Sequence, residues 1–156
     1  MLEFGPAGHV ARSMTRLHLA LLGSFDARLD PGGRLTLARQ KVAALLAFLA
    51  STPGRLHRRD TLAALLWADA PSPRARQSLR TALAELRLAL APVSSCLIER
   101  GDAVGLDPDA VDVDVARFEA LLANGGPAAL EQAAGIYRGE LLEGLRVAEA
   151  PFEEWL

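Results

Sequence analysis

The sequence contains almost no cysteine and no long hydrophobic run. Cys96 is its one cysteine, which excludes an internal disulfide framework and is typical of a protein in a reducing cytoplasm. Arg, Asp or Pro interrupts every apolar stretch before it reaches the roughly 18 residues that a membrane-spanning helix needs. The first residues lack the apolar core of a signal peptide, so we predict a flexible N-terminal tail over residues 1–15. These absences indicate a cytoplasmic protein with no membrane partner.

The sequence also lacks the residue patterns of common catalytic and metal sites. Its single lysine, Lys41, does not belong to a P-loop motif, which excludes a nucleotide site of that kind. His9, His18 and His57 are far from one another and from Cys96, so no metal-ligand spacing is present. No serine has the His and Asp neighbours that would make it a nucleophile. We therefore expect neither an enzyme nor a cofactor or metal site.

Each part of the chain is poor in charge of one sign. Residues 1–106 contain 14 Lys and Arg against 8 Asp and Glu, whereas residues 107–156 contain 3 against 11. A GC-rich genome would explain why nearly all basic residues are arginine, but it does not explain why the charges segregate. The pattern indicates two functional parts, and it favours a polyanion as the partner of the first.

The first two thirds of the chain predict a small sheet, helices and a hairpin. Apolar or alternating residues bounded by turn sequences, such as those at 30–33 and at Gly101-Asp102, are typical of antiparallel strands. Such strands are expected at residues 17–22, 25–29, 34–37, 96–100 and 103–106. Apolar residues recur at helical spacing over 42–49 and 62–66, which predicts the first two helices.

A third helix has the clearest boundaries. Ser72 is expected to cap its N-terminus and Pro73 to occupy its first position, while Ala91-Pro92 would end it after Leu90. One buried seam is predicted from the leucines at helical spacing, namely Leu79, Leu83, Leu86 and Leu90.

The side of this helix opposite the seam predicts nucleic-acid contact. Short residues let a helix approach bases in the major groove, and Gln and Arg can bond base edges bidentately. Base-edge contacts are expected from Gln77, Arg80, Thr81 and Ala84. Phosphate contacts are expected from the surrounding basic residues, namely Arg39, Lys41, Arg55, Arg58, Arg59, Arg74, Arg76, Arg87 and Arg100. The alternative is an ordinary solvated helix face with scattered arginines.

A break at residues 107–109 is expected to separate two domains. Beyond it, apolar residues predict one helix around 118–122, closed by glycines at 125–126, and a second helix opened by Pro127. The two resemble one pair of a tetratricopeptide-type (TPR-like) array, and one pair cannot bury its own face. It must therefore pack on the first domain, on another chain, or on residues beyond this sequence. The predicted fold class is α+β, with the tail (1–15), a winged helix-turn-helix domain (16–108) and the truncated start of an α-helical regulatory domain (109–156).

The chain resembles a known family of regulators over about nine tenths of its length. The resemblance rests on LTLARQK at 35–41, PGR at 53–55, LAALLW at 62–67, ARQSLRTAL at 75–83, LR at 86–87, LDP at 106–108, VDVARF at 113–118, YRGELLEGL at 137–145 and EEWL at 153–156. Residues 17–106 resemble the winged helices of the OmpR/PhoB type. With the remainder, the chain is similar to the Streptomyces antibiotic regulatory protein (SARP) class, in which such a domain precedes a bacterial transcriptional activation domain.

The resemblance implies a cytoplasmic transcriptional activator that binds tandem repeats of double-stranded DNA near promoters. The third helix would enter the major groove, and the hairpin would be the wing. It also implies two or more subunits on the DNA, such as a homodimer, and contact with RNA polymerase through residues 68–72, where Asp69 is the charged member.

Several residues depart from the family pattern. Glu85 and Leu88 stand where basic residues are frequent, and Val104 and Gly105 replace the tyrosine and basic residue common in the wing. Arg58 stands where a serine often caps the second helix, and family members continue beyond residue 156. These departures favour the alternative of a protein-interaction module that retains the winged-helix fold without strong DNA binding.

Overall fold

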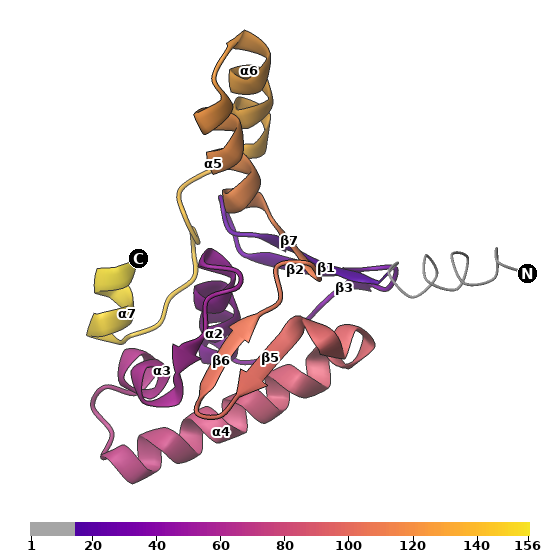
Figure 1. Ribbon diagram of the computed structural model, residues 1–156. Coiled ribbons are helices and arrows are strands. Elements are labelled where there is room, and N and C mark those ends of the chain that lie inside the picture. Colours follow the sequence, from indigo (N-terminus) through magenta and orange to yellow (C-terminus); the bar gives the residue numbers. More distant parts are fainter. Residues whose placement is uncertain (1–14) are drawn as a thin grey trace, which may run out of the picture.

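The computed structural model describes residues 15–156, so all but the last residue of the predicted tail lies outside the described residues (Figure 1). Its strands are β1 (Arg16–Ala20), β2 (Asp26–Asp30), β3 (Gly33–Arg34), β4 (His57–Arg58), β5 (Leu97–Arg100), β6 (Ala103–Leu106) and β7 (Val111–Val113). Its helices are α2 (Gln40–Ser51), α3 (Arg59–Leu66), α4 (Ser72–Ala89), the 3-10 helix η1 (Ala91–Cys96), α5 (Asp114–Asn124), α6 (Pro127–Ile136) and α7 (Ala150–Trp155). This order confirms the predicted α+β winged-helix fold.

The N-terminal sheet has the strand order β3-β2-β1-β7. Strand β1 pairs antiparallel with β2, as predicted, and parallel with β7 from beyond residue 108. The predicted strand over 34–37 is too long, because β3 contains only Gly33 and Arg34 before the chain leaves the sheet to reach α2. Leu35 and Leu37 still pack against the core. The alternation of apolar residues therefore predicted correctly which side chains face the core, although the strand itself is short.

Helix α4 is positioned by its leucine seam. The four predicted seam residues are 0–1% exposed and join α2 and α3 in one hydrophobic core. Because each buried leucine contributes about 1.5–3 kcal/mol relative to an exposed one, the seam fixes the rotation of the helix. The predicted Ser72 cap is wrong. The N-cap position is Pro71, whose carbonyl accepts a bond from the Ala75 N–H at 2.9 Å, so Ser72 is itself helical and makes no capping bond.

The wing is a three-stranded sheet in the order β4-β6-β5. Its hairpin turns at Gly101, which has a φ of 57°, a conformation that glycine adopts without strain. A Cβ atom on Gly105 would collide with the Arg55 carbonyl oxygen, so this position of β6 requires glycine. The unusual Gly105 therefore allows the wing to lie close to the chain that precedes β4.

Residues beyond the predicted boundary divide into two structural parts. Helices α5 and α6 form a pair that projects from the N-terminal sheet (Figure 1). The following segment returns to the winged helix, where Leu142, Leu145, Val147 and Phe152 are buried in the same core. Helix α7 packs against α3. Of the helix pair itself, α5 contacts β1 and β7 of the N-terminal sheet, which is one of the three packing partners left open by the sequence. The domain boundary after residue 108 remains a prediction.

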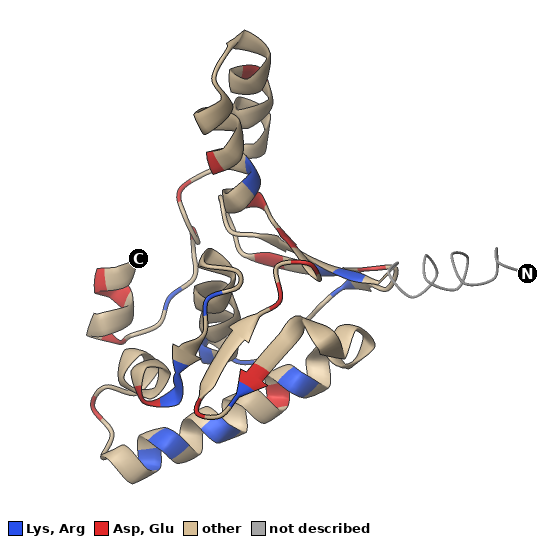
Figure 2. Cartoon of the chain, in the orientation of Figure 1, with Lys and Arg blue, Asp and Glu red and all other residues tan. Residues whose placement is uncertain are grey.

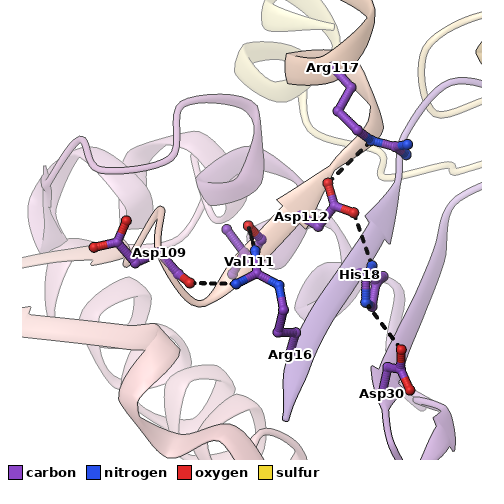
Figure 3. Close-up of polar contacts among 7 residues, drawn as sticks. All are labelled: Arg16, His18, Asp30, Asp109, Val111, Asp112 and Arg117. Atoms are coloured by element: carbon purple, nitrogen blue, oxygen red, sulfur yellow. Dashed lines mark hydrogen bonds and ion pairs between the residues drawn. The ribbon is translucent and has the colours of Figure 1, made fainter. Parts of the chain in front are cut away.

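Polar contacts join β7 and α5 to the first strand (Figure 3). The Nδ1 atom of His18 lies 3.1 Å from an Asp112 carboxylate oxygen, and the Arg117 guanidinium contacts the other oxygen at 3.2 Å. Arg16 donates a bond to the Val111 carbonyl at 3.0 Å. The contacts made by His18 and Arg16 connect residues more than 90 positions apart in the sequence.

Asp114 makes the most buried of these connections. Its side chain is at the start of α5 and only 4% exposed. The two carboxylate oxygens accept bonds from the N–H groups of Leu21 at 2.8 Å and Leu22 at 3.0 Å. Because β1 has ended at Ala20, these donors have left its strand ladder, and the carboxylate satisfies them.

Candidate nucleic-acid interface

The outward surface of α4 is open to solvent. Its exposed residues are Arg74, Arg76, Gln77, Arg80, Thr81, Ala84, Arg87 and Leu88. Figure 2 shows basic residues distributed along this helix, which lies next to the wing. Helix α7 packs on α3 and leaves the outward surface uncovered. The sequence therefore predicted the rotation of α4 correctly, with the seam inside and the four expected base-contacting side chains outside.

Three of these four residues are joined by hydrogen bonds within the helix. The Arg80 guanidinium donates a 2.5 Å bond to Gln77 Oε1, and the Thr81 hydroxyl donates to the Gln77 main-chain carbonyl at 3.2 Å. The bond between Arg80 and Gln77 holds two long side chains in a defined arrangement. The Gln77 amide NH₂ and the other guanidinium N–H groups remain as donors toward a partner.

Glu99 of β5 fixes the wing to the helices by binding two arginines. One carboxylate oxygen accepts a 2.7 Å bond from Arg87 Nε, and the other accepts bonds from Arg59 at 2.7 Å and from Arg87 Nη2 at 3.2 Å. The hydrogen bond from Arg87 is the main cause that lowers the pKa of Glu99, and the charge of Arg59 adds to it. The same bond raises the pKa of Arg87. The wing, α3 and α4 are therefore held by one ionised carboxylate.

The turn of the wing also contacts the start of α3. The Arg59 main-chain N–H donates to the Asp102 carbonyl at 2.8 Å, and its guanidinium donates to the Gly101 carbonyl at 2.9 Å. Arg58 stands at the N-cap of α3 without a side-chain capping bond. Its guanidinium lies 3.7–3.8 Å from the carboxylates of Asp60 and Asp102. The carbonyl groups of the wing turn thus accept hydrogen bonds from the first residue of α3.

Four other predicted phosphate-binding residues, and Arg80, which is predicted to contact a base, have charge available for a partner. Within residues 15–156, no carboxylate forms an ion pair with Arg55, Arg74, Arg76, Arg80 or Arg100. All five are exposed. Two lie in the first turns of α4, and Arg100 lies beside the wing turn. Unpaired guanidinium groups on neighbouring elements can each neutralise a phosphate.

Arg39 and Lys41 each form an ion pair with a glutamate of the chain. Arg39 forms a 2.7 Å ion pair with Glu85 of α4, which gives a role to an acidic residue that is unusual for the family. Lys41 binds Glu149 at 2.8 Å and lies over the Trp67 ring, 5.3 Å from its centre. A phosphate contact by Lys41 would require breaking this pair.

Sequence reasoning missed Glu99 and Glu149 as organising residues. Glu149 accepts a bond from the Ala68 N–H at 3.0 Å as well as binding Lys41, and so attaches the C-terminal segment to the loop before α4. Glu99 acts across 40 positions and Glu149 across 108. No local pattern marks either residue, because an isolated glutamate is compatible with any exposed position.

These features define a winged helix-turn-helix protein in which the outward surface of α4 is exposed and the wing is bonded to α3 and α4. No protein-family model and no curated protein matches the sequence. Among solved structures the chain is similar to EmbR of Mycobacterium tuberculosis in complex with a low affinity phosphopeptide, with a TM-score of 0.76 and 26% sequence identity. The match covers 90% of this chain and 41% of the EmbR chain.

EmbR is a SARP-family regulator with a winged helix-turn-helix, so the similarity supports the SARP-type resemblance found in the sequence. It also supports the prediction that the chain is not an enzyme, because that family is not enzymatic. In the part of the chain that the structure describes, no helix is long and apolar enough to cross a membrane. No group of three or more His, Cys, Asp or Glu residues among 15–156 could hold a metal ion.

Proposed function

We propose that this chain is a sequence-specific double-stranded DNA-binding regulator of transcription. The observation that carries the proposal is the exposed outward surface of α4, which presents Gln77, Arg80, Thr81 and Ala84 together. A helix of this width fits the major groove, where Gln and Arg donors reach adenine and guanine edges and small residues permit close approach.

The surrounding arginines supply the phosphate contacts in this proposal. Arg74 and Arg76 lie at the N-terminal end of α4, and Arg55, Arg58 and Arg100 lie around the wing. Arg59 and Arg87 would contact phosphate while still held by Glu99, since an arginine has more donors than the carboxylate occupies. Arg39 and Lys41 would contribute after exchange of their present carboxylate partners.

The finer features of the proposal come from the SARP-type resemblance. The protein would act in the cytoplasm as an activator, bind tandem repeats near promoters as two copies, and contact RNA polymerase through residues 68–72. The chain spans 41% of the length of EmbR, so these features concern a whole regulator of which this chain corresponds to one part.

Binding to random duplex DNA at two salt concentrations tests the proposal. We expect affinity to fall steeply with salt, because each neutralised phosphate releases counterions. Arg76→Ala should flatten the logarithmic salt slope by about one unit on every sequence. Arg138→Ala, an exposed arginine two residues after the end of α6 and next to Gly23 in the turn between β1 and β2, is the matched control and should change nothing. Salt-independent binding, or no binding, contradicts the proposal.

A protein-interaction module is the second candidate function. The α5–α6 pair exposes Leu122, Leu130 and Tyr137, each about half accessible, and so offers apolar area to another protein. Glu85 and Glu99 neutralise arginines near α4, which also weakens the attraction for phosphate. Absence of duplex binding at low salt in the test above would favour this candidate.

A further inference from the structure

The outward surface of α4 changes character along the helix. Its N-terminal half is polar and basic, with Arg74, Gln77 and Arg80, whereas the C-terminal half carries Ala84 and Leu88. Leu88 is 79% exposed, and no other large hydrophobic residue among 15–156 is more exposed. At 3.6 residues per turn, Leu88 continues the line of the proposed base-contacting residues. An apolar side chain thus stands within a surface otherwise suited to polar recognition.

The charged neighbours of Leu88 are directed to the flanks of the helix. Glu85 pairs with Arg39 on one side, and Arg87 pairs with Glu99 on the other. The space between these two ion pairs is left to Leu88. The centre of this half of α4 therefore offers a partner the apolar side chain of Leu88 and no free charge that could bind a phosphate.

Thr81 adds to the apolar character. Its hydroxyl proton is used in the bond to the Gln77 carbonyl within the helix, so this exposed side chain offers a partner its methyl group and an oxygen that can only accept. A methyl group, the Ala84 side chain and the Leu88 side chain follow one another along the outward surface.

We infer that this apolar half of α4 reads thymine, through contact of Leu88 with the 5-methyl group in the major groove. Thymine is the base whose major-groove edge carries a methyl group, and apolar side chains recognise it by excluding water. The inference rests on the proposed function, because the same helix must lie in the groove. Arg80 and Leu88 are eight residues apart, about 12 Å along the helix. Leu88 therefore reads a thymine about three or four base pairs from the base that Arg80 reads.

Replacement of thymine by deoxyuridine tests this inference, because it removes the 5-methyl group alone. A preferred duplex is first selected from random sequences with the full chain. Each thymine of that duplex is then replaced singly, and the dissociation constant is measured for the parent chain, Leu88→Ala and Leu122→Ala. Leu122 is 47% exposed on α5 and provides the same substitution away from α4. Circular dichroism checks that each variant is folded.

We expect one or two thymines at which the parent chain loses about fourfold in affinity on loss of the methyl group. Leu88→Ala should bind thymine and deoxyuridine equally at those positions, whereas Leu122→Ala should keep the parent's discrimination. The inference is overturned if no position responds to methyl removal, or if Leu88→Ala discriminates as the parent does. Failure to select any duplex is a different result, which overturns the proposed function together with this inference.

Discussion

Replacing the buried Asp114 by asparagine should destabilise the protein by about 2 kcal/mol. The carboxylate is 4% exposed and accepts main-chain bonds from Leu21 and Leu22. Asparagine preserves the shape but has one acceptor oxygen, and its NH₂ group would face the second N–H. One buried donor left without a partner costs about 1–3 kcal/mol. For a chain of this length the expected loss lowers the melting temperature by about 4–8 °C.

Urea denaturation followed by tryptophan fluorescence measures this loss. The matched control is Asp112→Asn, two residues earlier, because Asp112 is 29% exposed in its side chain and is held by a hydrogen bond with His18 and an ion pair with Arg117. Partly exposed pairs of this kind contribute at most about 1 kcal/mol. Equal free energies of unfolding for the two variants would refute the reasoning that Asp114 joins α5 to the first strand through main-chain bonds.

Three further predictions concern the wing and the region beneath it. Glu99→Gln should lower the free energy of unfolding by about 1 kcal/mol at pH 7, because exposed charge-assisted bonds contribute modestly. Since the pKa of Glu99 is lowered, this difference should persist above about pH 4 and disappear on further acidification, as urea titrations at several pH values would show. Gly105→Ala should cost about 1–3 kcal/mol in the same assay, because its Cβ atom collides with the Arg55 carbonyl; an unchanged midpoint would contradict the close approach. Burial, with the nearby charge of Arg55, lowers the pKa of His57, so its contribution to stability should be present above about pH 6.5 and decline as the pH falls; His57→Gln should remove this part of the pH dependence.

Features with a local signature could be predicted from the sequence. The leucine seam of α4 follows from helical spacing alone, and the wing turn follows from Gly101-Asp102 between two apolar segments. The outward position of Gln77, Arg80 and Thr81 then follows from the seam, since a helix with one buried side must expose the other. The predicted recognition surface is therefore a consequence of short-range pattern.

Features that depend on distant residues could not be predicted. Strand β7 lies parallel to β1 across more than 90 residues, and three residues are too few for a distinct strand pattern. Asp114 has the sequence context of an ordinary first-turn helix residue, and only the fold brings it to the Leu21 and Leu22 amides. The prediction that Ser72 caps α4 was wrong for a different reason. A hydroxyl caps a helix only if the helix starts after it, and α4 already includes Ser72.

The affinity of Arg80→Ala for a selected duplex, divided by its affinity for random duplex, tests the central claim most directly. Arg80 is exposed, has no acidic partner within residues 15–156 and is held only by Gln77, so its replacement should leave the fold intact. If α4 reads base edges, this specificity ratio should fall about 5- to 150-fold, while binding to random duplex weakens much less. An unchanged ratio would contradict the account, because the outward surface of α4 would then contribute nothing to the choice of sequence.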